Sequence, residues 1–135
     1  MAIHDNKFFD ASDIEIERGG VSYTVDTLEE LSQKYSLERD DLFLIVGADN
    51  LLEIDTWKNP RRIISLSQLV AVGRPDFRID KGKVPFDFIK IDAPLLQISS
   101  SNIRQMVREG KSIKYLVTPQ VEQYIFRHHL YKNQN

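Results

Sequence analysis

A serine-rich segment, Ser99-Ser100-Ser101-Asn102-Ile103-Arg104, combines residue types that suit a phosphate group. Ser99 stands at an expected helix start, where exposed backbone N–H groups attract anions. Ser100 adds a small hydroxyl, and the Arg104 guanidinium can donate two parallel hydrogen bonds to phosphate oxygens. The segment predicts a polyphosphate contact. The same letters fit an alternative equally well, in which the serines only cap the helix and Arg104 is solvated.

A second segment, Gly47-Ala48-Asp49-Asn50, directly follows an apolar run that is typical of a buried strand. Glycine permits close approach of the backbone to a ligand, and the Asp49 carboxylate can accept hydrogen bonds from ribose hydroxyls. An ordinary turn followed by an aspartate cap explains the letters as well. Since ligands bind at the carboxyl ends of parallel strands, Gly47, Asp49 and Arg74 are predicted to lie beside one cleft.

Three further residues could contact a ligand. Trp57 is the only tryptophan, and it precedes the helix start Asn59-Pro60 instead of lying on a periodic apolar face. Its indole can stack on a ligand ring or cover the protein core, as loop tryptophans more commonly do. Tyr23 and Thr24 can contact a ligand or merely lead into a helix capped by Asp26. The residue types leave both interpretations open.

Alternating helix and strand signals indicate the elements that must position these residues. The spacing Asp26-Thr27-Leu28-Glu29 is that of a capping box, and it predicts a helix over about 27–35. Further helices are expected after Asn59-Pro60, from the serine-rich segment to Gly110, and after Thr118-Pro119. Strands are predicted over 42–46, 69–72 and 88–91, the first two of them buried on both faces. Residues 13–17 alternate between acidic and apolar, which predicts a half-exposed strand with solvated, non-catalytic carboxylates.

The pattern predicts an α/β fold with a mostly parallel sheet. The 135 residues are 41% hydrophobic and 28% charged, as in ordinary soluble proteins, and a single domain over 1–135 is expected. A formal net charge of −2 gives no basic field, which argues against a nucleic acid partner. No apolar run approaches the roughly 20 residues that cross a membrane. The lack of cysteine excludes disulfides and fits a cytoplasmic location.

Common nucleotide-binding and metal-binding motifs are missing from the sequence. It contains neither a Walker loop nor a Gly-x-Gly-x-x-Gly fingerprint. His4, His128 and His129 lie near the two ends without metal-ligand spacing, so surface positions and no metal site are expected. The sequence leaves homo-oligomer formation open.

Five segments, taken in order, resemble bacterial nicotinate-nucleotide adenylyltransferases. They are Gly20-Val21-Ser22-Tyr23-Thr24-Val25-Asp26-Thr27-Leu28, Gly47-Ala48-Asp49-Asn50, Thr56-Trp57, Gly73-Arg74-Pro75 and Ile98-Ser99-Ser100-Ser101-Asn102-Ile103-Arg104. The resemblance covers nearly the whole chain. It implies a Rossmann-like nucleotidyltransferase fold that moves an adenylyl group from ATP to nicotinate mononucleotide. The products are deamido-NAD and pyrophosphate, in NAD biosynthesis, and Mg²⁺ accompanies the ATP.

The resemblance also implies a role for each site residue. Tyr23, Thr24 and Trp57 would hold the nicotinate ring and its carboxylate. Gly47 and Asp49 would meet the nucleotide and its ribose. The phosphates of ATP would be bound by three residues, Ser99, Ser100 and Arg104, of which Arg104 is the expected catalytic residue.

One family motif, the His-x-Gly-His phosphate-binding signature, has no match in this chain. The resemblance therefore implies a fold whose N-terminal βα portion is missing, and a chain that by itself does not turn over at a normal rate. A second hypothesis is a non-catalytic nucleotide-binding or interaction domain derived from the family. A third is a related adenylyltransferase for nicotinamide mononucleotide or phosphopantetheine.

Overall fold

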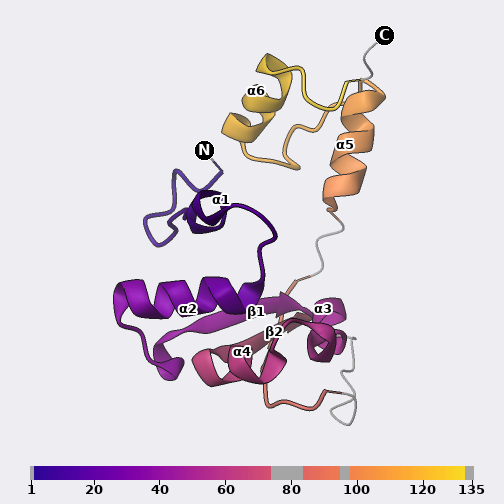
Figure 1. Cartoon of the computed structure of the whole chain (residues 1–135). Coiled ribbons are helices and arrows are strands. Elements are labelled where there is room, and N and C mark those ends of the chain that lie inside the picture. Colours follow the sequence, from indigo (N-terminus) through magenta and orange to yellow (C-terminus); the bar gives the residue numbers. More distant parts are fainter. Residues whose placement is uncertain (1, 74–83, 95–97, 133–135) are drawn as a thin grey trace. The chain divides into compact units, whose positions relative to one another are not determined.

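A computed structural model describes residues 2–73, 84–94 and 98–132 (Figure 1). The chain divides into two compact units, which are described separately. The sheet unit is Ser12–Leu95, and the terminal unit combines Met1–Ala11 with Leu96–Asn135. A single domain over 1–135 stays a prediction.

The sheet unit is built on three parallel strands in the order β1-β2-β3. Their bounds are Phe43–Gly47 for β1, Gln68–Gly73 for β2 and Ile89–Asp92 for β3. In the register Ile45 lies opposite Val70, and Val70 lies opposite Ile89. The predicted α/β fold with a parallel sheet is therefore confirmed.

Helices of the sheet unit connect and cover these strands. The α-helices are α1 (Ile14–Arg18), α2 (Thr24–Tyr35), α3 (Ala48–Leu52) and α4 (Pro60–Leu66), and the 3-10 turns are η1 (Arg39–Asp41) and η2 (Ile54–Thr56). Helix α4 starts as predicted, because Pro60 needs no N–H partner in the first turn. Asn59 before it adopts a left-handed conformation with φ of 50°, which asparagine tolerates better than most residues.

The core of the sheet unit lies on one face of the sheet. Leu44, Val46, Leu69 and Ala71 alternate along β1 and β2 and point to the same side, as the period of two requires. They pack with the buried side chains Leu51, Ile54, Ile63, Val25 and Leu28 from the turn and helices. Helix α2 also contacts α4. This packing orders the ends of α2, η2 and α4, which carry the candidate site.

The prediction that β1 is buried on both faces is wrong. Phe43 is 50% exposed and Ile45 is 67% exposed, whereas their neighbours Leu44 and Val46 face the core. An apolar run shows that a strand can be covered on both sides, but in β1 only the side chains on the core side of the sheet unit are covered. The prediction fits β2 better, since Val70, which points to the opposite face of the sheet from Leu69 and Ala71, is also buried.

Two predictions near the start of the sheet unit are wrong, one on the type of an element and one on the start of a helix. Residues 14–18 form helix α1, where Glu17 N–H donates to the Asp13 carbonyl at 2.9 Å, and not a strand. Five alternating residues are too few to fix a period, and a helix pairs its own backbone where a strand would need a neighbour. Helix α2 begins at Thr24, so Asp26 lies in its first turn and does not form the expected capping box.

The terminal unit contains α5 (Ser100–Arg108) and α6 (Pro119–Arg127). Val107, Ile113 and Ile125 form its buried cluster. Both predicted helices are confirmed, and Gly110 has a φ of 68° just after α5, as a helix-ending glycine should. The three histidines are exposed, as predicted. No helix in the described part of the chain has the length and apolar character that a membrane crossing requires.

Candidate active site

A cavity of about 290 Å³ lies in the sheet unit, between the start of α2 and the segment that joins η2 to α4. Its lining residues are Ser22, Tyr23, Thr24, Thr56, Trp57, Lys58 and Ile63. Pockets that enclose a drug-sized ligand measure about 300–1,000 Å³. The cavity is therefore suited to a single substituted ring and not to a whole dinucleotide.

Helix boundaries position the three predicted ring-binding residues around this cavity. Tyr23 is the N-cap of α2 in an extended conformation, and Thr24 is the first helical residue. Trp57 follows η2, also with an extended backbone. The structure thus brings together residues that are more than thirty positions apart in the sequence. Their roles toward a ligand stay predictions.

Trp57 has two environments. It is half-buried and packs against both core clusters of the sheet unit, in the company of Leu44 and Ile64. It also lines the cavity. The two interpretations of this tryptophan are therefore compatible, because one side of the indole can cover the core while the rest faces the cavity.

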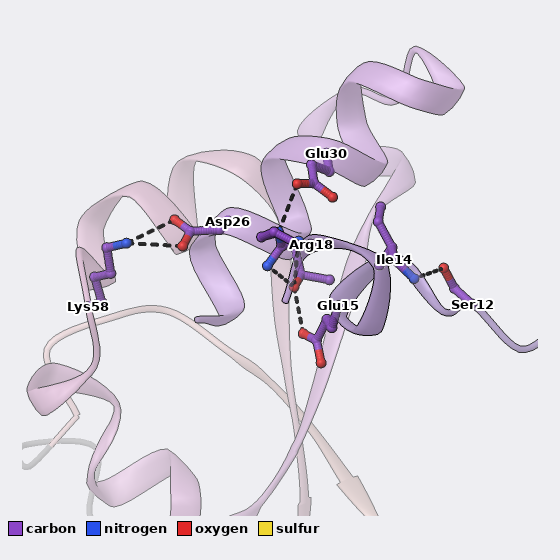
Figure 2. Close-up of polar contacts among 8 residues, drawn as sticks. Ser12, Ile14, Glu15, Arg18, Asp26, Glu30 and Lys58 are labelled. Atoms are coloured by element: carbon purple, nitrogen blue, oxygen red, sulfur yellow. Dashed lines mark hydrogen bonds and ion pairs between the residues drawn. The ribbon is translucent and has the colours of Figure 1, made fainter. Parts of the chain in front are cut away.

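Lys58 is a cavity residue that the sequence interpretation missed. Its Nζ lies 3.1 Å from Asp26 Oδ1 and 3.0 Å from Asp26 Oδ2, as Figure 2 shows. The same Nζ lies 4.2 Å from the centroid of the Tyr23 ring, within the range of a cation–π contact. Its position directly after Trp57 was not a sufficient signal, because the partner Asp26 lies 32 residues away.

Arg18 connects helix α1 to α2 by hydrogen bonds, a few residues before the cavity residues Ser22 and Tyr23 in the sequence (Figure 2). Its Nε donates to Glu30 Oε1 at 2.8 Å, and its Nη1 and Nη2 donate to Thr27 Oγ1 at 3.3 Å. The Thr27 hydroxyl in turn donates to Glu15. The hydrogen bond between Arg18 and Glu30 lowers the pKa of the carboxyl below its usual value and raises the pKa of the guanidinium. This cluster holds both ends of the segment 19–22 that leads to Tyr23.

The predicted nucleotide and ribose contacts lie at the carboxyl end of β1. Gly47 is the last residue of that strand, and Asp49 is exposed in the first turn of α3. A Cβ added to Gly47 would meet no atom within 4 Å, and its φ of −67° suits any residue. The described protein atoms therefore do not require glycine here, whereas a closely bound ligand would. Arg74, the third residue expected at this cleft, lies outside the described residues.

The predicted phosphate-binding residues lie at the start of α5, in the terminal unit. Ser99 is the N-cap, and its Oγ accepts a hydrogen bond from Asn102 N at 3.1 Å, so its capping role is confirmed. Ser100 is exposed at the first helical position. Arg104 donates from Nη2 to Ser101 Oγ at 3.1 Å. Ser99 keeps its O–H as a donor, and the phosphate role stays a prediction.

Comparisons with known proteins define the class of this chain. The Cytidylyltransferase-like family model matches residues 1–106. A Plasmodium falciparum nicotinic acid mononucleotide adenylyltransferase complexed with APC has a TM-score of 0.64 at 22% identity, covering 84% of this chain and 60% of that one. The same enzyme complexed with NaAD has a TM-score of 0.62, covering 82% and 58%. The fold and the family model define a Rossmann-like nucleotidyltransferase.

Sequence relatives narrow the family further. A probable nicotinate-nucleotide adenylyltransferase of Desulfitobacterium hafniense (strain Y51) is 40% identical over 97% of this chain and 67% of its own length. The protein of the same name from Tropheryma whipplei (strain TW08/27) is 43% identical over 98% and 70%. The chain belongs to the nicotinate-nucleotide adenylyltransferase family, and it spans about two thirds of the length of these relatives.

Proposed function

We propose that this chain carries the nicotinate-binding and triphosphate-binding residues of an enzyme that transfers an adenylyl group from ATP to nicotinate mononucleotide. The products are deamido-NAD and pyrophosphate, and the proposed place is NAD biosynthesis in the cytoplasm. The observation that carries the proposal is the cavity where Tyr23, Thr24 and Trp57 meet, in a chain 40% identical to a family member. Its volume and aromatic lining fit a pyridine ring.

The proposed reaction is a displacement at phosphorus. An oxygen of the 5'-phosphate of nicotinate mononucleotide bonds to the α-phosphorus of ATP, and the bond from that phosphorus to pyrophosphate breaks. Such transfers depend on positioning and on neutralising phosphate charge more than on covalent help from the protein. Trp57 would stack on the pyridine, with Tyr23 and Thr24 beside its carboxylate.

The ATP side of the site is proposed from two groups of residues. Gly47 and Asp49 would meet the nucleoside, with the carboxylate accepting hydrogen bonds from ribose hydroxyls. Ser99, Ser100 and Arg104 would bind the phosphates and offset the charge of the departing pyrophosphate. Mg²⁺ would arrive with ATP, bound by phosphate oxygens. Within the described residues no group of three or more His, Cys, Asp or Glu could hold a metal ion.

Pyrophosphate release and ligand binding test the proposal together. Trp57 is the only tryptophan, so its fluorescence reports binding of nicotinate mononucleotide at the cavity. We expect binding by the 135-residue chain but little pyrophosphate release, because the chain has no His-x-Gly-His signature. Preorganised donors at a reacting centre each supply factors of about a hundred to a thousand.

A matched polypeptide that also carries the family's His-x-Gly-His segment upstream should release pyrophosphate. Equal turnover by both polypeptides would refute the requirement for that segment. Binding without turnover by both would favour the alternative of a non-catalytic nucleotide-binding domain. Lack of nicotinate mononucleotide binding by both would refute the proposed substrate.

A further inference from the structure

Lys58 lines the cavity, where its positive charge can distinguish an anionic ligand from a neutral one. Among the described residues that line it, Lys58 is the cation, and the other polar groups are the hydroxyls of serine, threonine and tyrosine and the indole N–H of Trp57. Ser22, Tyr23 and Thr24 can donate to a carboxylate or to a carboxamide, because a hydroxyl both donates and accepts. An ammonium only donates, and it attracts an anion over a neutral group. Lys58 is therefore the lining residue whose chemistry separates an acid from its amide.

The ammonium of Lys58 keeps donor capacity for a ligand. It has three N–H bonds, and the two Asp26 oxygens at 3.1 Å and 3.0 Å use at most two of them. The contact with the Tyr23 ring places the ammonium at 4.2 Å from a residue that itself lines the cavity. Asp26 and Tyr23 thus fix the position of a flexible side chain in advance, which lowers the entropic cost of using it.

We propose that Lys58 is a specificity-determining residue that favours the pyridine carboxylate over the pyridine carboxamide. This inference rests on the proposed function, since it concerns the nicotinate end of the same substrate. Sites reject an analogue most strongly when a polar group of the site is left without its partner. With the amide bound, the third donor of Lys58 faces a weaker, uncharged acceptor.

The expected effect is moderate because Lys58 is not deeply buried. Its side chain is 41% exposed, and that of Asp26 is 32% exposed, so water screens the charges in part. Replacing Lys58 by methionine keeps an unbranched stem and removes the charge. We expect the preference for the acid to fall about tenfold, which corresponds to about 1.4 kcal/mol.

The experiment titrates the 135-residue chain with nicotinate mononucleotide and with nicotinamide mononucleotide, following Trp57 fluorescence. Lys58→Met should weaken binding of the acid and leave binding of the amide unchanged, whereas Lys58→Arg should keep the preference. The matched control is Lys34→Met, which removes another exposed lysine–tyrosine contact, at 5.5 Å from Tyr35, away from the cavity. It should change neither affinity.

The variant Asp26→Asn tests whether Lys58 recognises the charge of the ligand or has only a structural role. It breaks the ion pair but leaves the ammonium, so the preference for the acid over the amide should be kept. Equal weakening of both nucleotides by Lys58→Met and Asp26→Asn would overturn the inference, because Lys58 would then only hold its loop against α2. An unchanged preference in Lys58→Met would also overturn it. A wild-type chain that binds neither nucleotide would instead refute the proposed function.

Discussion

Replacement of Trp57 by alanine tests the aromatic side of the site. The indole contributes to the cavity lining and to both core clusters, so its loss should affect binding and stability through different contacts. Stacking of a base on an aromatic side chain is worth about 1–3 kcal/mol by alanine substitution. At about 1.4 kcal/mol per tenfold change, affinity for nicotinate mononucleotide should fall by about 5-fold to 150-fold.

The stability cost must be separated from the loss of stacking. Full truncation of a buried aromatic residue costs about 3–5 kcal/mol, and Trp57→Ala should cost less because the side chain is only half-buried. Isothermal titration calorimetry gives the affinity, since the fluorescent reporter is lost, and thermal denaturation gives the stability. Trp57→Phe keeps a ring and should recover much of the affinity.

Leu69→Ala is the matched control for core damage. Leu69 is 2% exposed in β2 and does not line the cavity, so its truncation should lower stability while nicotinate mononucleotide still binds. If Trp57→Ala instead kept wild-type affinity in a folded protein, the stacking role would be refuted. The tryptophan would then serve only to cover the core.

Two further predictions concern charged residues. Arg104→Lys, in a polypeptide that also carries the His-x-Gly-His segment, should raise the KM for ATP or lower kcat with an unchanged melting temperature, because an ammonium cannot bind two phosphate oxygens as a planar fork does. Full catalytic efficiency in that variant would exclude the phosphate role. Glu30→Gln should lower the melting temperature at pH 7, since its carboxylate pairs with Arg18 and has a lowered pKa. That stabilisation is complete above the ordinary carboxyl pKa of 4.5 and is lost as the pH falls through the lower folded value, so wild type and variant should converge in acid. A melting-temperature difference that persists at pH 2 would contradict this account.

Local signals in the sequence were sufficient for part of the fold. The start of α4 could be predicted because Asn59 and Pro60 act on their own backbone, and β2 could be predicted because its run is apolar throughout. The segment 14–18 could not, since an acidic and apolar alternation fits a strand edge and a solvated helix equally. The prediction that β1 is buried on both faces failed for a related reason. Which face of a strand is covered depends on the neighbouring elements and not on the residues of the strand itself.

The candidate site also contains residues that the sequence could single out and one that it could not. Trp57 could be singled out because it is the only tryptophan and lies off any periodic apolar face, and Tyr23 because it leads into an expected helix. Lys58 could not, since it lies between η2 and α4, whereas its partner Asp26 lies 32 residues away in α2. Only the packing of α2 against α4 brings the two together. A lysine in a loop is by default solvated, and no sequence spacing marks this one as an exception.

The start of α2 links the ion pair to the cavity through the helix backbone. Tyr23 provides no side-chain cap, so the first-turn N–H groups leave a partial positive charge there that no capping side chain offsets. Asp26 lies in that first turn, where a carboxylate is stabilised by about 0.3–1 kcal/mol, and it uses both oxygens to hold Lys58. The helix start and the Lys58 ammonium are therefore two positive groups beside the cavity, one in the backbone and one on a side chain, and the Asp26 carboxylate offsets both in part. Removing Lys58 leaves the helix start in place, which is why we expect Lys58→Met to reduce the preference for an anionic ring and not to abolish it.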